Sequence, residues 1–258
     1  DGIRDLVRSR GLGDVYKRQH VPFENATKLV KAARSMSPQT AIRGPVEFWE
    51  DHLRWGSGGT CFASTYAYQF LLRFLGFTSR LLFCRLPSSG PCAHAALLVE
   101  AEGRPWLVDV GYALPSPLPV PDRGVIRART PLYDMEFRSG ARGEYLVFTE
   151  DDRGQRFRYQ VKLRGATEPE YLAAWQETFR LEAPYMRRIA LGRFRGATRY
   201  LFKESGVVFA ISRQGESAIP LEGPAPRALA GFFDLPEPLM DAAFRALDRL
   251  GGLRSSSF

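Results

Sequence analysis

The sequence has few cysteines and histidines and lacks the signatures of several large protein classes. Its 258 residues include three cysteines without regular spacing and three histidines, which argues against a disulfide framework and a zinc site. No apolar run approaches the ~18–20 residues that cross a bilayer, and no signal peptide is visible. Internal repeats, a Walker loop and a dinucleotide glycine fingerprint are also missing. We therefore expect a cytoplasmic protein with no bound metal and no membrane partner.

The charge balance is basic, but its distribution does not indicate a nucleic-acid-binding protein. The formal net charge is +8, while 45% of the residues are hydrophobic and 25% are charged. This composition is typical of a globular protein with a substantial core. The arginines are scattered and no predicted helix carries a continuous basic face, so the stripe expected of a nucleic-acid interface is missing.

Residues 57–62 place a cysteine at the predicted start of a helix. Two glycines and Thr60 precede Cys61, and a helical pattern follows until Gly76, a helix-stopping residue. With Thr60 as N-cap, Cys61 lies in the first turn, where free amides and the helix dipole favour a thiolate nucleophile. The alternative is a cysteine simply packed in a core helix. The expected buried stripe of this helix consists of Phe62, Tyr66, Phe70 and Phe74, widened by Leu71 and Leu75.

A predicted hairpin brings a histidine and an aspartate to one face. His94 and Asp109 lie in two strand-like runs, and the segment between the runs is a turn signal. If Glu102 and Gly103 centre a tight turn, residues that face each other across the hairpin have numbers that sum to 205. The numbers of His94 and Asp109 sum to 203, so these two residues are diagonal neighbours on the same face. A half-buried aspartate also needs a polar partner. We therefore predict a triad with Cys61 as nucleophile, His94 as base and Asp109 as the residue that orients the imidazole.

Five motifs, in this order and approximate spacing, resemble the arylamine N-acetyltransferase family. They are Val-Pro-Phe-Glu-Asn at 21–25, Gly-Gly-Thr-Cys-Phe at 58–62, His-Ala-Ala-Leu-Leu-Val at 94–99, Trp-Leu-Val-Asp-Val-Gly-Tyr at 106–112 and Pro-Leu-Pro-Val at 117–120. The resemblance implies a Cys-His-Asp triad, acetyl-coenzyme A as co-substrate without a bound cofactor, and an aromatic amine, hydrazine or hydroxylamine as acceptor. A basic chain is compatible with binding the phosphates of coenzyme A.

The same resemblance implies an α+β, cysteine-proteinase-like fold in three parts. The predicted segments are a non-native or disordered leader at 1–19, a helical bundle carrying the nucleophile at 20–77, an antiparallel β-barrel carrying His and Asp at 78–165, a helical connector at 166–197 and an α/β lid at 198–258. Within these segments we expect helices over 20–35, 45–55, 168–192 and 236–250, and two or three strands over 198–222. The leader resembles translated sequencing-adapter sequence and is excluded from the fold prediction.

The surroundings of the nucleophile depart from the family pattern. Ser57 stands where the family usually has arginine, and Ala63 and Thr65 stand where it usually has glutamate and asparagine. The arginine of the family would pair with a buried acid, for which Glu24 is the candidate here. Arg54, in the preceding turn, is the predicted replacement. The triad itself is intact, so the chain resembles a divergent member of the family.

Several residues near the motifs have two interpretations. By resemblance Phe23 and Tyr112 bind the acceptor. From sequence alone, packing in the core is the favoured explanation of Phe23, and it explains Tyr112 equally well. Cys92 is the competing nucleophile because it lies two residues before His94, and Cys84 is expected to fill the core. A disulfide between these two cysteines would require an exported protein. No residue is assigned to coenzyme A binding.

The predicted function is an acyltransferase that works by double displacement through an acetyl-cysteine. Two alternatives remain open from sequence alone. One is a Cys-His-Asp amidase, hydrolase or amide synthase of the transglutaminase-like or papain-like superfamily, and the other is a degenerate relative that only binds ligands. Protection of Cys61 from alkylation by coenzyme A thioesters distinguishes them. We expect a monomer or homodimer that binds no nucleic acid.

Overall fold

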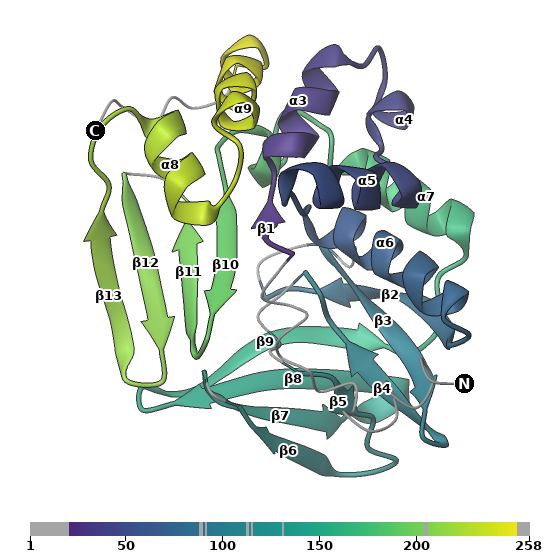
Figure 1. Cartoon of the computed structure of the whole chain (residues 1–258). Helices are drawn as coiled ribbons and strands as arrows, with labels where there is room; N and C mark the ends of the chain where they lie inside the picture. The colour runs from purple at the N-terminus through teal and green to yellow at the C-terminus, as the bar shows by residue number, and fades with distance from the viewer. Residues whose placement is uncertain are drawn as a thin grey trace.

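The structure is a computed structural model that describes residues 21–251 except 88, 89, 91, 112, 113, 115, 131, 204 and 205. The predicted leader at 1–19 and the predicted pocket residue Tyr112 lie outside the described residues. The described chain has the predicted α+β architecture: helices near the N-terminus, a central antiparallel barrel and a C-terminal sheet with two helices (Figure 1). None of the helices within this described part is long and apolar enough to cross a membrane.

The N-terminal part consists of a short strand and four helices. They are β1 (Phe23–Glu24), α3 (Ala26–Arg34), α4 (Pro38–Ala41), α5 (Pro45–Trp55) and α6 (Cys61–Phe74). Helix α5 has the predicted bounds, because proline suits the first position of a helix and Gly56 ends it with a left-handed φ of 65°. Helix α6 begins at Cys61, as predicted. It ends at Phe74, and the chain turns away at Gly76, whose φ is 86° and whose amide donates to the carbonyl of Arg73 at 3.0 Å.

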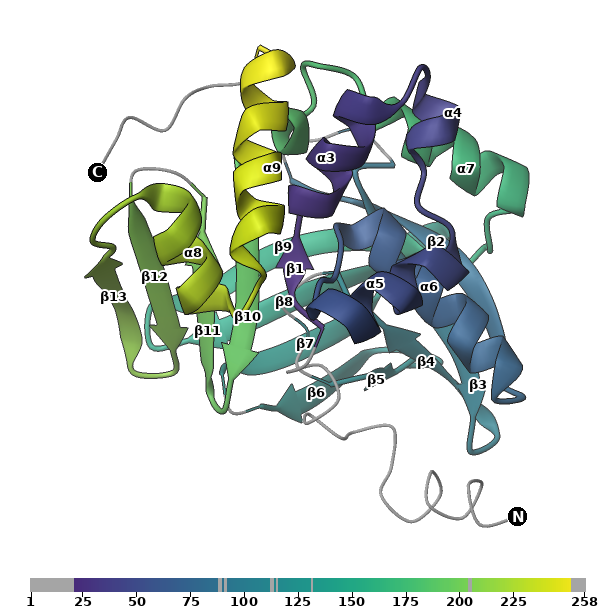
Figure 2. The same cartoon turned by 45° about the horizontal axis from the view of Figure 1, so that its top comes forward.

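The barrel is an eight-stranded antiparallel sheet with the order β5-β4-β3-β2-β9-β8-β7-β6. The two end strands, β5 and β6, lie near each other, so the sheet is nearly closed (Figure 2). A 3₁₀ turn, η1 (Ala141–Gly143), precedes β8. The strands are β2 (Thr78–Arg85), β3 (His94–Ala101), β4 (Arg104–Val108), β5 (Leu118–Pro119), β6 (Val125–Arg129), β7 (Asp134–Ser139), β8 (Glu144–Asp151) and β9 (Gly154–Lys162).

The β3–β4 hairpin has the predicted register. Glu102 and Gly103 form its two-residue turn with φ values of 53° and 72°, and two positive φ values are what a type I′ turn requires. The opposed residues have numbers that sum to 205, for example Leu97 opposite Val108. Asp109 directly follows β4, so it remains close to the start of β3 across the hairpin.

The buried face of α6 differs from the predicted stripe. Phe62 is buried, but Phe70 and Phe74 are 50% and 81% exposed. The face toward the barrel instead carries small and polar residues, among them Thr65, which donates to a β3 carbonyl at 3.2 Å, and Gln69, which donates to a β2 carbonyl at 3.4 Å. Because these contacts bring the helix close to the sheet, the larger aromatic rings on its other side are left in solvent.

The C-terminal part contains a connector, a second sheet and two helices. The elements are α7 (Glu168–Glu177), η2 (Pro184–Met186), β10 (Leu191–Arg195), β11 (Thr198–Phe202), β12 (Val207–Ser212), β13 (Gly215–Pro220), α8 (Ala225–Phe233) and α9 (Glu237–Arg249). The sheet order is β1-β10-β11-β12-β13, so β1 from the N-terminal part forms its edge. Helix α9 packs beside α3, which ties the two ends of the described chain together (Figure 2).

Two predictions for this part are wrong. Helix α7 ends at Glu177, so the helical range predicted over 168–192 is too long, and α8 has no counterpart among the predicted elements. Strand β10 lies at the end of that range and is paired with the distant β1. The local sequence of a strand paired over such a distance gives little indication of it, because the preference for a strand depends on the neighbouring strands that it packs against. The last helix, predicted over 236–250, agrees with α9 to within one residue at each end.

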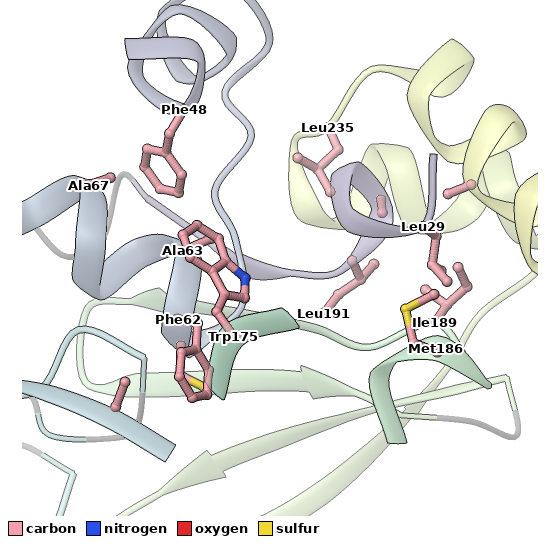
Figure 3. Packing of buried hydrophobic residues seen from close by; sticks show 14 of the residues in the cluster. Leu29, Phe48, Phe62, Ala63, Ala67, Trp175, Met186, Ile189, Leu191 and Leu235 are labelled. Atoms are coloured by element: carbon pink, nitrogen blue, oxygen red, sulfur yellow. The ribbon is translucent and has the colours of Figure 1, made fainter. Parts of the chain in front are cut away.

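Two hydrophobic clusters divide the interior. The first joins the N-terminal helices to α7 and the second sheet, and Figure 3 shows Trp175 of α7 beside Phe62 and Ala63 of α6. The second fills the barrel and includes Tyr159 and Cys84. Cys61 belongs to the first cluster, whereas Cys84 and Tyr159, which contact His94, belong to the second, so the predicted triad lies where the two meet.

Candidate active site

Cys61 is the first residue of α6 and is only 7% exposed. Thr60 occupies the N-cap position in an extended conformation, as predicted, but its side chain makes no capping hydrogen bond. Backbone bonds hold the preceding loop instead, since the Glu24 amide donates to the Gly59 carbonyl at 3.3 Å and the Gly59 amide donates to the Pro22 carbonyl at 3.4 Å. Because Thr60 does not cap the first turn, its amides remain able to bind an anion.

His94 and Asp109 form a buried hydrogen-bonded pair. His94 is the first residue of β3, Asp109 directly follows β4, and the two are 3% and 0% exposed. His94 Nε2 lies 2.8 Å from Asp109 Oδ2, and Asp109 Oδ1 accepts a bond of 3.1 Å from the amide of Gly111. Both oxygens of the carboxylate are therefore held, and with them the orientation of the imidazole.

Cys61 completes this cluster because its side chain hydrogen-bonds to His94. Since Nε2 of the ring faces Asp109, Nδ1 is the nitrogen left for the sulfur. The ring also packs against Tyr159, with 5.4 Å between centroids. The structure thus brings together the three residues that the sequence nominates, from the start of a helix, the start of one strand and the end of another.

Opposing effects act on the pKa of His94. Burial is the largest and lowers the pKa, because the charged ring loses its water. The charge of Asp109 and the hydrogen bonds to Asp109 and Cys61 raise the pKa, and together they take it from 6.5 to about 10. The ring is therefore protonated at neutral pH, and a positive charge lies beside the Cys61 sulfur.

Two glycines allow the backbone to approach Cys61 and the loop before it closely. A Cβ on Gly111 would lie 2.5 Å from both Cα and Cβ of Cys61, and a Cβ on Gly58 would lie 1.8 Å from the Pro22 carbonyl oxygen. Both distances are far inside van der Waals contact, so any side chain there would displace the loop. Gly111 thereby lets the turn after Asp109 lie directly on the first residue of α6.

Comparison with known proteins decides the family. A family model described as N-acetyltransferase matches residues 14–187 of the 258-residue chain. The chain belongs to this N-acetyltransferase family. An arylamine N-acetyltransferase of Escherichia coli (strain K12) is 42% identical over 97 residues, which make up 36% of this chain and 32% of that protein. The match therefore spans about a third of this curated relative.

Solved structures of arylamine N-acetyltransferases share the fold of the chain. The Nocardia farcinica protein has a TM-score of 0.72 and 21% identity, covering 91% of this chain and 87% of that one. A Bacillus cereus protein, described as having a unique Cys-His-Glu catalytic triad, has a TM-score of 0.70 and 15% identity, with coverages of 87% and 90%. The acetyltransferase fold thus extends over most of the chain, and the family predicted from the five motifs is confirmed.

Arg43, and not the predicted Arg54, is the arginine that approaches Glu24. Its side chain is 6% exposed, lies 4.0 Å from Glu24 Oε1, and donates to Asp51 at 3.0 Å and to the Gly58 carbonyl. Arg54 is exposed on the surface of α5. The prediction was wrong because Arg43 comes from the loop between α4 and α5, where no local pattern indicates a tertiary contact with the loop before the nucleophile.

Phe23 lines a cleft that opens beside the triad. Its ring meets Tyr185 edge to face, with 5.3 Å between centroids. The cleft has a volume of about 370 Å³, includes Phe23 and Gly111 in its lining, and extends between the barrel and the second sheet. Because Gly111 lies against Cys61, this cleft passes close to the Cys61 side chain. Tyr112, the other predicted pocket residue, lies outside the described residues.

The other two cysteines have different surroundings. Cys84 is fully buried in the barrel opposite His94, and burial, followed by the charges of Asp109 and Cys61, raises its pKa well above the ordinary value. Cys92, the competing nucleophile, is exposed and lines a separate hollow of about 360 Å³, and partial burial raises its pKa. All three cysteines are free thiols. Within the described part of the chain, no group of three or more His, Cys, Asp or Glu side chains is placed to hold a metal ion.

Proposed function

We propose that this chain is an arylamine N-acetyltransferase that moves an acetyl group from acetyl-coenzyme A to an aromatic amine or hydrazine through an acetyl-cysteine. The observation that carries the proposal is the hydrogen-bonded cluster of Cys61, His94 and Asp109 at the start of α6. The name of the Escherichia coli relative supports the reaction class. The Cys-His-Glu triad described for the Bacillus cereus protein also has a carboxylate in third place, which supports the role of Asp109.

In the first half-reaction, the sulfur of Cys61 attacks the thioester carbonyl of acetyl-coenzyme A. Protonated His94 and the positive end of the α6 dipole stabilise the attacking thiolate. The bond between the carbonyl carbon and the sulfur of coenzyme A breaks, and His94 gives its proton to the departing thiolate. Cys61 is left as an acetyl thioester. Because one thioester replaces another, the exchange is nearly balanced in free energy.

In the second half-reaction, the amine attacks the acetyl carbonyl of the acetyl-enzyme. Neutral His94 accepts a proton from the attacking nitrogen, and the sulfur of Cys61 leaves as a thiolate beside the imidazolium that has formed. Asp109 keeps the ring oriented and stabilises its positive charge in both halves. The apolar ring of Phe23 lines the cleft that leads to the sulfur, a suitable surface for an aromatic acceptor.

Both half-reactions pass through a tetrahedral intermediate with a negatively charged oxygen. The amides in the first turn of α6 are the donors we assign to this oxygen, since the side chain of Thr60 does not occupy them. These donors also explain why the nucleophile is at the start of a helix and not within it.

Intact mass spectrometry tests the proposal directly. Wild-type protein mixed with acetyl-coenzyme A should gain one acetyl group, and Cys61→Ala should gain none. Addition of an aromatic amine should remove the acetyl group from wild type and release the acetylated amine. If Cys61→Ala still gains a single acetyl group, the nucleophile is another residue. If the acetyl-enzyme forms but only water discharges it, the chain is a thioester hydrolase.

Other expectations from the sequence stay predictions. They are a monomeric or homodimeric state, a cytoplasmic location, the absence of nucleic-acid binding and a role for Tyr112 beside the acceptor.

A further inference from the structure

Lys28 is a buried lysine in the first turn of α3. It is 8% exposed, and its Nζ donates to the carbonyl and the hydroxyl of Thr178 at 2.6 and 2.8 Å. The ammonium also lies 4.6 Å from the centre of the Phe179 ring. Thr178 is the C-cap of α7, and a cation suits the negative end of a helix dipole. These contacts explain how the core accommodates the side chain, but all of them are made with uncharged groups.

Lys28 lines a small gap that borders the start of α6. The lining of the gap includes Thr60 and Ala63, which lie on either side of Cys61 in the chain. Figure 3 shows Trp175, another lining residue, beside Ala63. The gap has a volume of about 10 Å³, which leaves room for no more than about one water molecule. A charge at its edge is therefore weakly screened from the nucleophile.

The gap is cationic, and Lys28 is the cation in it that lacks a carboxylate partner. Lys31 and Arg43 also line the gap, and none of its described lining residues is acidic. Lys31 pairs with Glu47, and Arg43 pairs with Asp51 at 3.0 Å. No carboxylate within the described part of the chain pairs with Lys28. Its charge is therefore not neutralised locally, in contrast to the charges of its two neighbours.

The charge of Lys28 is coupled to the charge of Cys61. Burial lowers the pKa of Lys28 from its ordinary 10.5 to about 7, while the charge of Cys61 raises it. Such coupling is reciprocal, so an ammonium on Lys28 favours the thiolate of Cys61 as much as the thiolate favours the ammonium. A glutamate at position 63, which is usual in the family, would place a carboxylate beside this gap, whereas Ala63 leaves the charge of Lys28 free to act on the sulfur.

We propose that Lys28 is a positioning residue of the active site, whose ammonium, held at the end of α7, favours the thiolate form of Cys61. His94 supplies one positive charge from the barrel, and Lys28 supplies a second from the helical part. This inference goes beyond the proposed function, because it concerns the charge on the sulfur before any acyl donor binds. The same charge also favours Cys61 as the leaving thiolate in the second half-reaction.

Alkylation of Cys61 by iodoacetamide, followed by peptide mapping over a pH range on both sides of 7, tests the inference without an acyl donor. The first test variant, Lys28→Gln, keeps an N–H donor for Thr178 but removes the charge. The second, Lys28→Met, removes both. The matched control is Lys31→Gln, one turn further along α3, where the charge is already paired with Glu47. Circular dichroism checks that each variant folds, and Lys28→Gln alone decides the result if Lys28→Met does not fold.

The expected result has a defined pH dependence. Below a pH of about 7, where Lys28 is protonated, Cys61 should be alkylated on the order of tenfold more slowly in both test variants than in wild type. The difference should close as the pH rises through about 7, because Lys28 of the wild type then becomes neutral as well. Lys31→Gln should follow wild type at every pH.

Three outcomes would overturn the role of Lys28. One is a wild-type alkylation rate in Lys28→Gln below a pH of about 7. Another is a loss confined to Lys28→Met, which would mean that the residue only joins α3 to α7. The third is a loss of equal size at every pH, since a displaced sulfur does not depend on the protonation of a lysine.

The same variants separate this inference from the proposed function. If wild type forms the acetyl-enzyme with acetyl-coenzyme A while Lys28→Gln is alkylated as wild type is, the role of Lys28 is overturned and the function stands. If alkylation responds as expected but wild type forms no acetyl-enzyme, the proposed function falls and the role of Lys28 stands.

Discussion

Cys61 and Cys84 are two buried thiols near the same imidazole, but their surroundings differ in every other respect. Cys84 lies opposite His94 in the β2–β3 pair, is 0% exposed and is surrounded by the apolar side chains of the barrel core. Cys61 lies at the start of α6, hydrogen-bonds to His94 and touches Gly111 in the lining of the cleft. Proximity to a histidine therefore does not by itself single out the proposed nucleophile. A helix start, an oriented imidazole and access to a cleft distinguish Cys61 from Cys84.

The largest expected effect comes from removing the group that orients His94. In Asp109→Asn the ring loses the carboxylate charge that raises its pKa and keeps the burial that lowers it, so its pKa falls and the imidazolium is less favoured. We expect acetyl-enzyme formation to slow by about 10²- to 10⁴-fold, and Cys61 to become nearly as unreactive toward iodoacetamide as Cys84. Stopped-flow acetylation measures the first effect and peptide mapping the second. Asp122→Asn, an exposed site, is the control, and equal rates in the two variants would contradict the role of Asp109.

The same pair gives a pH dependence of stability with a defined sign. The pKa of His94 is higher in the folded protein, at about 10, than its ordinary 6.5, so protonation of the ring stabilises the fold. This contribution is complete below a pH of about 6.5 and is lost as the pH rises through about 10. Urea unfolding should therefore show a stability gap between wild type and Asp109→Asn that narrows over this range. A gap that widens with pH would contradict the charge state of the ring.

The next largest effect concerns the loop that holds Cys61 in place. Arg43→Met removes the buried cation that faces Glu24 and that donates to Asp51 and the Gly58 carbonyl, while Glu24 keeps its hydrogen bonds from Thr27. Removing one partner of such a buried ion pair costs about 3 kcal/mol or more of unfolding free energy. The exposed Arg54→Met should change stability by less than about 0.5 kcal/mol. Chemical denaturation of both variants, with acetylation rates measured in parallel, checks the contrast. Comparable losses in the two would show that Arg43 has no special position.

A smaller effect is expected where the turn after Asp109 lies on α6. In Gly111→Ala the new methyl group would lie 2.5 Å from backbone and side-chain carbons of Cys61, so the helix start or the turn must move. Overpacking of this kind costs about 1–3 kcal/mol, and the shifted sulfur should be acetylated more slowly. Gly44→Ala, where a Cβ would meet nothing within 4 Å, is the matched control. An unchanged acetylation rate in Gly111→Ala would mean that the site tolerates the displacement.

The sequence allowed those parts of the site to be predicted that depend on local rules. Cys61 at a helix start follows from glycines, a capping residue and helical periodicity. The pairing of His94 with Asp109 follows from a two-residue turn, because Glu102 and Gly103 fix the register and side chains alternate between faces. The five motifs were sufficient to identify the family and the three-part architecture.

The remaining features depend on contacts between distant segments. Arg43 reaches the loop before Cys61 from a turn with no pattern of its own. Strand β10 pairs with the two-residue β1, which supplies no strand signal. The aromatic rings of Phe70 and Phe74 suggested a buried stripe, but close packing of small and polar residues against the barrel determined which face of α6 is buried. In each case a tertiary contact overrode the local preference.

The most direct test of the central claim is to locate the acetyl group in wild-type protein after brief exposure to acetyl-coenzyme A. Tandem mass spectrometry of the digested protein reports the acetylation of each cysteine separately. Cys61 should carry the acetyl group, while Cys84 and Cys92 remain free. An acetyl group on Cys84 or Cys92, with Cys61 unmodified, would contradict the account.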